Sequence, residues 1–372
     1  MRCSGGREGF RGGWTHRAIP RILGPMAPRL ALLTPFAHPS VRGNSVTVTR
    51  IARGLRERGL ELRVWDLSAT SEPSVEAEVE RYAPAVVHAF HAYRTGPLAL
   101  RLARRAELPL VVTLTGTDAN HDLLDPERAP VVRRVLEGAA RATVFHASVA
   151  NRIAGMLPDL RGRLVVVPQA ARFGADEPLA LEAHGAARAG QVLFVFPGGI
   201  RPVKRPLLPL GPLARLAARP AAVRLLYAGP ILDPEEGEAL RRALAERPWA
   251  THLGTVPHAQ MKLLLTRADV VLNCSISEGG MANSVLEALA LGRAVLAADI
   301  EGNRSLIEEG VTGLLFRDED ELERQATRLV LDPVLRARLG SAGRELVERC
   351  YPPAREIDGY LEIYRGLAPV SA

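Results

Sequence analysis

The sequence has 372 residues, of which 47% are hydrophobic and 24% charged, an ordinary globular composition with enough length for two domains. No apolar run approaches the ~20 residues that a membrane-spanning helix requires. The three cysteines lie far apart, match no metal-ligand pattern and suit a reducing, cytoplasmic setting.

The net charge of +7 does not indicate a nucleic-acid-binding protein, because most of it lies at the start of the chain. In residues 1–25, five arginines and one glutamate contribute +4, and aromatic residues are sparse in the whole sequence. This segment is rich in Gly and Arg and lacks the apolar core of a signal peptide. We expect residues 1–25 to be a disordered extension, with Met26 as the natural beginning.

The first half of the remaining chain alternates between apolar strand patterns and helical patterns. Strands are predicted at 30–33, 62–65, 85–89, 110–114, 142–145 and 164–167. Helices are predicted up to about residue 58, where Gly59 is a stop signal, at 75–82, 97–105 and 126–139, and as a short one before 164. Residues 171–190, rich in Gly, Ala and charge, break the pattern and predict an interdomain linker.

The second half repeats the alternation. Strands are predicted at 192–196, 223–227, 251–253, 270–272 and 294–298. Helices are predicted at 207–218, 235–246, from 257, from 283 or 284, and at about 319–330, 333–349 and 355–365.

This rhythm predicts an α/β protein made of two doubly wound, Rossmann-like domains that face each other across a cleft. The amino-terminal domain is expected at 26–180 and the carboxy-terminal domain at 191–350. Residues 351–372 are expected to form a helix that packs back toward the first domain. Ligands of such sheets bind outside the carboxyl ends of the strands, so the loops at those ends hold the candidate residues.

The densest pattern lies in residues 268–316. A buried strand is followed by a loop with Glu278, Gly279 and Gly280, and a helix begins at Asn283 or Ser284. The helix amino terminus offers unpaired N–H groups for a phosphate. Glu278 and Glu287 beside it can accept hydrogen bonds from sugar hydroxyls, which indicates a nucleotide sugar. For Glu287 an ordinary helix glutamate is an equal alternative.

A second pattern, in residues 198–204, follows the first strand of the second domain and reads GGIRPVK. Its glycines are expected to let the backbone turn sharply. Arg201 and Lys204 suit a diphosphate and would stabilise the charge that grows on a leaving nucleoside diphosphate. Two solvated loop cations are the alternative.

Weaker signals lie in the first domain. Gly43 permits close backbone approach, while Asn44 or Ser45 can cap the following helix. Alone, this motif is fully explained by capping.

Polar residues also gather after the third and fourth strands, in HAFHAYRTG and LTGTDANHD; they include His88, His91, Tyr93, Arg94 and Asp118. His91 could contact a sugar hydroxyl or handle a proton, and Asp118 could orient His91, Arg94 or an acceptor hydroxyl. A metal set of His91, His121 and Asp122 is rejected because its spacing matches no ligand pattern.

These motifs, above all SEGGMANSVLEALALGRAV with EGN and VTGLLF downstream, resemble a family 4 glycosyltransferase of the GT-B fold over most of residues 26–366. Within it, TGTD and RPVK are similar to the branch that holds the glycosyltransferase 1 domain-containing proteins and the selenosugar synthases. The resemblance implies a retaining transfer from a nucleotide-diphosphate sugar, with a UDP-sugar as the expected donor. It implies no cofactor and no metal.

Residue by residue, the resemblance implies that Arg201 and Lys204 hold the diphosphate, Glu287 the ribose and Glu278 the donor sugar. His91 and Asp118 would face the donor sugar or the acceptor, with Tyr93 and Arg94 on the acceptor side. The remaining donor-binding positions would be Gly43, Asn44, Gly199, Gly279, Gly280, Met281, Ala282 and Asn283.

One departure from the family pattern concerns the spacing of the two glutamates. The family places seven residues between them, whereas this sequence has eight, from Gly279 to Leu286. Either the Gly-Gly loop bulges by one residue or Glu278 does not reach the sugar.

Two other functions compete with transfer to a small-molecule or glycan acceptor. A sugar-nucleotide epimerase of the same fold would convert the donor without an acceptor. A non-catalytic nucleotide-sugar-binding protein would bind it without reaction. The helix over 98–105 suits peripheral contact with a membrane surface as well as an ordinary amphipathic surface.

Overall fold

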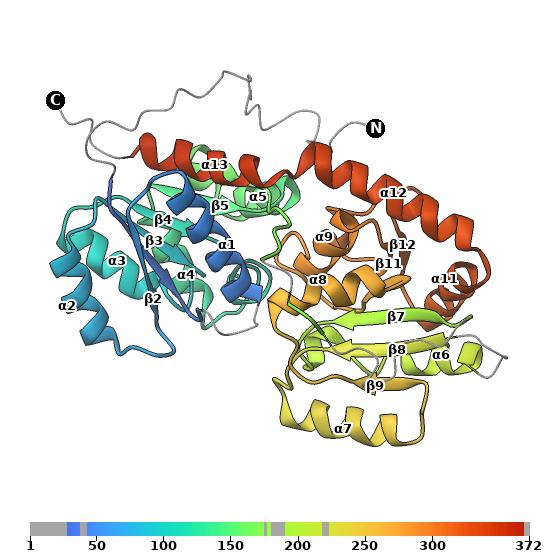
Figure 1. The fold of residues 1–372 in the computed structure, drawn as a ribbon. Coiled ribbons are helices and arrows are strands. Elements are labelled where there is room, and N and C mark those ends of the chain that lie inside the picture. Colours follow the sequence, from blue (N-terminus) through green and yellow to red (C-terminus); the bar gives the residue numbers. More distant parts are fainter. Residues whose placement is uncertain (1–27, 38–42, 175–176, 180–189, 218–222, 368–372) are drawn as a thin grey trace. The chain divides into compact units, whose positions relative to one another are not determined.

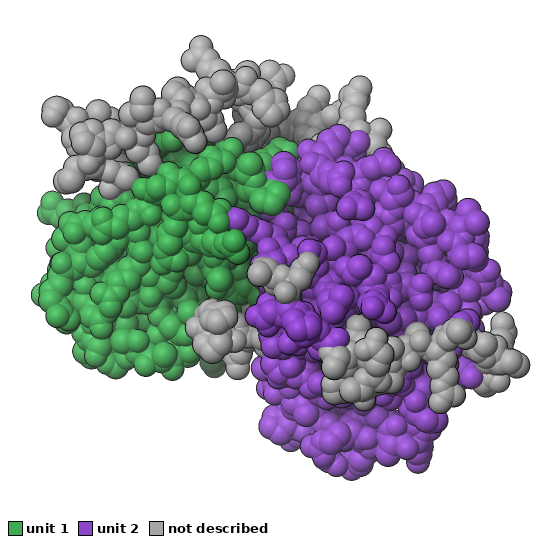
Figure 2. Space-filling view, viewed as in Figure 1, with its two compact units in different colours: residues 1–169, 353–372 green, residues 170–352 purple. Residues whose placement is uncertain are grey.

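The computed structural model describes residues 28–37, 43–174, 177–179, 190–217 and 223–367. The predicted extension at 1–25 and most of the predicted linker at 171–190 lie outside them. The chain forms two compact units (Figure 2), one of residues 1–169 with 353–372, the other of residues 170–352. We call them unit 1 and unit 2. The predicted end of the first domain at residue 180, and the predicted limits of the second at 191 and 350, differ from these unit boundaries and stay predictions.

Unit 1 is built on a fully parallel sheet with the strand order β2-β1-β3-β4-β5-β6 (Figure 1). Its strands are β1 (Leu30–Thr34), β2 (Leu62–Asp66), β3 (Val86–Phe90), β4 (Leu110–Thr113), β5 (Arg141–Val144) and β6 (Leu164–Val166). Every residue of β1, β3 and β4 is buried, as expected for strands that helices cover on both faces.

The helices of unit 1 follow its strands. They are α1 (Gly43–Glu57), α2 (Glu72–Tyr82), α3 (Gly96–Arg105), α4 (Ala129–Glu137), α5 (Ala147–Met156) and the carboxy-terminal α13 (Pro353–Arg365). A π-helical turn η1 (Asp118–Asp122) and the 3-10 helix η2 (Pro158–Arg163) complete the connections. Gly59 has a φ of +85° two residues after α1 ends, which confirms it as the stop signal.

Unit 2 is built on a second parallel sheet, with the order β12-β11-β10-β7-β8-β9. Its strands are β7 (Val192–Pro197), β8 (Val223–Ala228), β9 (Ala250–His252), β10 (Val270–Asn273), β11 (Ala294–Ala298) and β12 (Leu314–Phe316). The chain runs outward in one direction from β7 and in the other from β10. The switch point where doubly wound sheets bind ligands therefore lies between β7 and β10.

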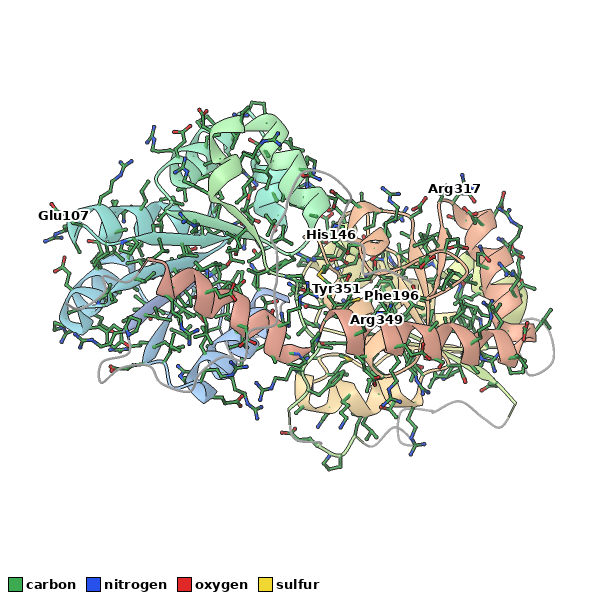
Figure 3. All side chains as sticks on the ribbon, turned by 90° about the horizontal axis from the view of Figure 1, so that it is seen from above. Glu107, His146, Phe196, Arg317, Arg349 and Tyr351 are labelled. Carbon is green, nitrogen blue, oxygen red and sulfur yellow. The ribbon has the colours of Figure 1, made fainter. Side chains whose placement is uncertain are left out.

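Unit 2 also carries helices between its strands. They are the short 3-10 helix η4 (Pro202–Lys204), α6 (Leu210–Ala217), α7 (Pro234–Ala245), α8 (His258–Arg267), α9 (Asn283–Ala290), α10 (Glu301–Arg304), α11 (Glu319–Leu331) and α12 (Pro333–Cys350). The core lies along the sheet, where the Phe196 ring (Figure 3) packs 5.1 Å from that of Tyr227, centroid to centroid.

Most predicted elements match the structure within three residues at each end. The short elements η1, η2, η4, α10 and β12 were not predicted. Among the described residues no helix is long and apolar enough to cross a membrane.

The last helix, α13, belongs to unit 1 and is part of its core. Arg50 of α1 donates to both carboxylate oxygens of Glu356, at 2.8 Å each, and the two side chains are only 5% and 1% exposed. Gly54 of α1 lies against Ile357, where a Cβ atom would come within 2.4 Å of the isoleucine side chain. Close backbone approach and a buried ion pair thus fix the position of α13 on α1.

A buried polar network joins α13 to the sheet of unit 1. His88 in β3 contacts the Tyr364 hydroxyl through Nδ1 at 2.6 Å and the Thr113 hydroxyl through Nε2 at 2.7 Å. Thr113 also lies 2.6 Å from the Thr143 hydroxyl and 3.3 Å from that of Tyr360. His88 is 0% exposed and lies within β3, so its prediction as one of the polar candidates after the third strand is wrong.

Burial lowers the pKa of His88 to about 3, from an ordinary value of 6.5. Between these values the unfolded chain binds a proton at this position that the folded protein does not. The contribution of neutral His88 to the stability of the folded protein is therefore fully present above pH 6.5, and it is lost as the pH falls toward 3. We expect the free energy of unfolding to decrease by up to ~1.4 kcal/mol per pH unit from this group.

The matched variant is His88→Gln, which keeps hydrogen-bonding capacity but has no titrating ring. Urea unfolding of both proteins at a series of pH values should show the wild-type stability falling toward that of the variant upon acidification. Parallel curves from pH 6.5 to 3.5 would mean that His88 titrates alike in both states.

Candidate functional site

Two loops meet at the switch point of unit 2, one at 198–205 after β7 and one at 274–282 after β10. The amide of Ile276 donates to the carbonyl of Val203 at 2.9 Å. The Arg205 guanidinium donates to the carbonyl of Cys274 at 2.7 Å, with Arg205 itself in a left-handed conformation at φ +48°. Cys274 is a buried free thiol, and its burial raises its pKa to about 12.

Between these loops, the ammonium of Lys204 forms an ion pair with the carboxylate of Glu278. Ser275 Oγ and Asn273 Nδ2 donate to the same carboxylate oxygen, at 2.7 and 3.0 Å. Burial raises the pKa of Glu278, but the Lys204 charge and these hydrogen bonds outweigh it and hold the pKa below its usual value. The carboxylate is therefore ionised at neutral pH. The lysine and glutamate side chains keep 16% and 14% of their surface exposed.

The EGN motif, residues 301–303, packs against Glu278 and orients one of its hydrogen-bond donors. A Cβ atom on Gly302 would lie 2.5 Å from the Cβ of Glu278, so only glycine lets α10 approach this closely. The side-chain amide of Asn303 donates to the Ala298 carbonyl at 2.8 Å and to Asn273 Oδ1 at 3.3 Å, which orients Asn273 toward Glu278. This gives the motif a physical reason that its sequence pattern did not reveal.

In the 198–205 loop, Gly199 allows close packing, and the sharp turn expected of the two glycines stays a prediction. Neither Gly198 nor Gly199 has a positive φ. A Cβ on Gly199 would come within 2.5 Å of the Leu232 side chain, and one on Gly229 within 2.2 Å of the Gly198 carbonyl. The loops after β7 and β8 thus pack backbone against backbone. Arg201, exposed, immediately precedes η4.

The first turn of α9 lies beside the end of β10, where Asn273 Nδ2 donates to Ser284 Oγ at 3.4 Å. The N-cap residue of α9, Ala282, has no polar side chain that could accept hydrogen bonds from the helix amides. Gly280 has a φ of +121°, and Met281 and Ala282 are buried before α9 begins at Asn283. Both explanations for the additional residue between the two glutamates stay predictions.

Glu287 lies on the second turn of α9 and is 7% exposed. His258, the first residue of α8, donates from Nε2 to Glu287 Oε1 at 2.8 Å. The Phe173 ring lies nearly parallel to the imidazole, with 12° between the planes and 6.2 Å between centroids. The Glu287 carboxylate is therefore mostly buried and held by a hydrogen bond from another helix. Its predicted contact with a ribose stays a prediction.

In unit 1, His91 and Asp118 form the loop core at the ends of β3 and β4. His91 has a φ of +87°, unusual for a residue with a side chain, and is 1% exposed. The Asp118 carboxylate, 0% exposed, accepts four backbone amides, those of Ala92, Thr115, Gly116 and Ala119, at 2.8–3.1 Å. In this state neither side chain is open to a ligand. Asp118 holds the strained peptide after His91, and direct substrate contact stays a prediction for both residues.

The other predicted residues of unit 1 lie around its own switch point, between β1 and β3. Arg94 is exposed and stands over the Phe36 ring at 5.6 Å, and Tyr93 is half-buried beneath Arg128 at 5.5 Å. Gly43 and Asn44 form the first turn of α1, with Gly43 exposed. Their predicted roles at a donor or acceptor are untested.

The sequence analysis did not identify four residues of the candidate site in unit 2, which are Asn273, Ser275, Arg205 and His258. Asn273 and Ser275 flank the buried Cys274, and polar residues at a strand end are a usable signal. His258 could not be identified in this way, because a single histidine at the start of a helix is common and indicates no function.

Across the described residues, no three His, Cys, Asp or Glu side chains are placed to share a metal ion. Metal independence nevertheless stays a prediction.

Comparison with known proteins is consistent with this geometry. Residues 191–332 match the family model described as glycosyl transferases group 1. The chain is 27% identical over 326 residues to glycosyltransferase 1 domain-containing protein 1 of Xenopus tropicalis, covering 86% of this chain and 92% of that protein. It is 29% identical over 285 residues to D-inositol 3-phosphate glycosyltransferase of Frankia alni, covering 70% and 69%.

Solved structures share the fold at lower identity. HepE of Anabaena in complex with UDP and glucose superimposes with a TM-score of 0.75 at 16% identity, covering 91% of this chain and all of that one. Sucrose-phosphate synthase of Thermosynechococcus elongatus gives 0.76 at 18% identity, covering 91% and 99%. The likeness extends over both units.

Proposed function

From the premise that this chain is a glycosyltransferase of GT-B fold with a group 1 domain in unit 2, we propose that it uses a UDP-sugar and retains the anomeric configuration, without a metal ion. The observation that carries this proposal is the Lys204–Glu278 pair at the switch point of unit 2, beside the uncapped start of α9. It combines a cation, a helix amino terminus and a carboxylate within one loop region.

The cation and the helix amides account for the leaving group. In the transfer, the bond between the anomeric carbon and the phosphate oxygen breaks, and its electron pair stays on the nucleoside diphosphate. The oxygen of a small-molecule or glycan acceptor forms the new bond to that carbon, and its proton is released. Lys204, Arg201 and the start of α9 would stabilise the diphosphate charge, which is the role that a metal ion has in other transferases.

The carboxylates account for the rest of the donor. Glu278 is ionised, and a carboxylate accepts hydrogen bonds from hydroxyls of the sugar. Glu287 would accept from the ribose. The choice of uridine is supported by the HepE structures, which hold UDP with glucose and UDP-glucose.

A thermal-shift panel of UDP-, GDP- and ADP-sugars, each with and without EDTA, tests the donor. At a ligand concentration of ~100 Kd the free energy of unfolding should rise by ~2.7 kcal/mol, a shift of several degrees in Tm. We expect the UDP-sugars to give the largest shift and EDTA to leave it unchanged. A larger shift with GDP- or ADP-sugars contradicts the uridine assignment, and loss in EDTA contradicts metal independence.

Product analysis tests the reaction. With donor and an acceptor library, NMR of the product should show the anomeric configuration of the donor. With donor alone, the sugar should be recovered unchanged or slowly hydrolysed. An epimerised nucleotide sugar would identify an epimerase, and an inverted product would exclude the retaining assignment.

A further inference from the structure

We propose that His258 is a positioning residue for the nucleotide: it fixes the Glu287 carboxylate so that its second oxygen meets the ribose hydroxyls. This inference rests on the proposed function, which places the ribose at Glu287. The two residues are 29 positions apart and come from different helices, α8 and α9.

The hydrogen bond defines which oxygen is left for a ligand. His258 Nε2 donates to Glu287 Oε1 at 2.8 Å, so the ring carries its proton on Nε2. Within the part of the chain that the structure describes, Oε2 makes no hydrogen bond. A carboxylate with one oxygen occupied by the protein and the other available is suited to the vicinal hydroxyls of a ribose.

Burial makes this orientation important. The Glu287 side chain is 9% exposed and the His258 side chain 30% exposed. A glutamate side chain has three rotatable bonds, and without a partner its carboxylate would have to lose this freedom when the nucleotide binds. Because the imidazole already fixes the carboxylate in the free protein, this conformational freedom does not have to be lost on binding. Phe173 in turn holds the plane of the ring by stacking on it.

The charge around the pair is consistent with positioning and not with proton transfer. Phosphate chemistry is assigned to Lys204 and the start of α9, and Glu278 is bound by Lys204, Ser275 and Asn273. The hydrogen bond that His258 donates goes to Glu287, which belongs to neither of these sets of groups. Its substitution should therefore alter donor affinity and leave the chemical step nearly intact.

The test compares nucleoside diphosphates with and without ribose hydroxyls. Dissociation constants for UDP and 2′,3′-dideoxy-UDP are measured by calorimetry for wild type, His258→Ala, His258→Gln and the control Gln260→Ala, two residues along α8 on another face. We expect His258→Ala to weaken UDP about tenfold and to leave dideoxy-UDP unchanged. His258→Gln, which keeps an N–H donor, should restore most of the affinity, and Gln260→Ala should match wild type.

Kinetics give a second readout, since His258→Ala should raise the donor KM with kcat within about twofold. In a Glu287→Ala background, His258→Ala should cause no further loss, because it acts through that carboxylate. Equal weakening of UDP and dideoxy-UDP by His258→Ala overturns the inference. If wild type binds UDP but does not discriminate against dideoxy-UDP, the ribose assignment of Glu287 fails. If wild type binds no UDP at all, the proposed donor itself is wrong.

Discussion

Replacing Lys204 with alanine should lower the turnover number of sugar transfer about 10²-fold or more without unfolding the protein, and Arg201→Ala should act similarly. Such losses are typical when one preorganised charge is removed from a developing anion. Lys204 is already held between two loops by its pair with Glu278, so little reorganisation is needed when the diphosphate binds. Steady-state assays with the donor selected by the thermal-shift panel measure the effect.

The control for Arg201→Ala and Lys204→Ala is Arg241→Ala on α7. It removes a cation from the same unit, but one whose side chain is 63% exposed and pairs with Glu238 of its own helix. Its activity should equal that of wild type. Circular dichroism checks that each variant is folded, since Lys204→Ala leaves Glu278 without its cation. Wild-type turnover in a folded Lys204→Ala protein would refute the role of this lysine.

Replacing Arg50 with alanine should reduce the free energy of unfolding of unit 1 by about 3–5 kcal/mol, because it leaves the buried Glu356 carboxylate without its partner. Glu356→Ala should cost a similar amount for the opposite reason. Joint replacement by apolar residues of similar volume should recover much of the loss. Urea unfolding gives the magnitude, and hydrogen exchange in β1 and β3 locates it in unit 1.

Arg53→Ala is the matched control on the same helix. Arg53 pairs with Glu57 one turn away, and the two side chains are 56% and 46% exposed. Water already screens this pair, so its removal should change stability by no more than ~0.5 kcal/mol. Equal effects of the Arg50 and Arg53 substitutions would show that the contact with α13 adds nothing to stability.

Much of the fold could be predicted because parallel strands covered on both faces appear as short apolar runs. The strand from Val270 and the helix from Asn283 were recognised in this way. The switch point could not be located in the same manner. It depends on β10 pairing with β7, a contact between runs far apart in the chain. Apolar periodicity identifies a strand but does not identify its neighbour.

The candidate site was predictable in its residue types and less so in its contacts. The sequence predicts both Lys204 and Glu278 as site residues. It does not predict that they form an ion pair, because they are 74 positions apart. His91 and His88 had the same appearance in the sequence, three residues apart after or within one strand. Only the end of β3, at Phe90, separates the loop histidine from the core histidine, and sequence patterns fix such ends less well than they fix the strand itself.

Because α13 completes unit 1, the order of synthesis matters for this protein. The polypeptide emerging from the ribosome contains all of unit 2 before the thirteen residues of α13 appear. Unit 2 can therefore finish folding first, the reverse of the usual amino-to-carboxyl order. Until translation ends, nascent unit 1 exposes the apolar surface that Ile357, Tyr360 and Tyr364 later cover, a natural target for chaperones. A premature stop codon near residue 352 would thus damage the first half of the protein more than the second.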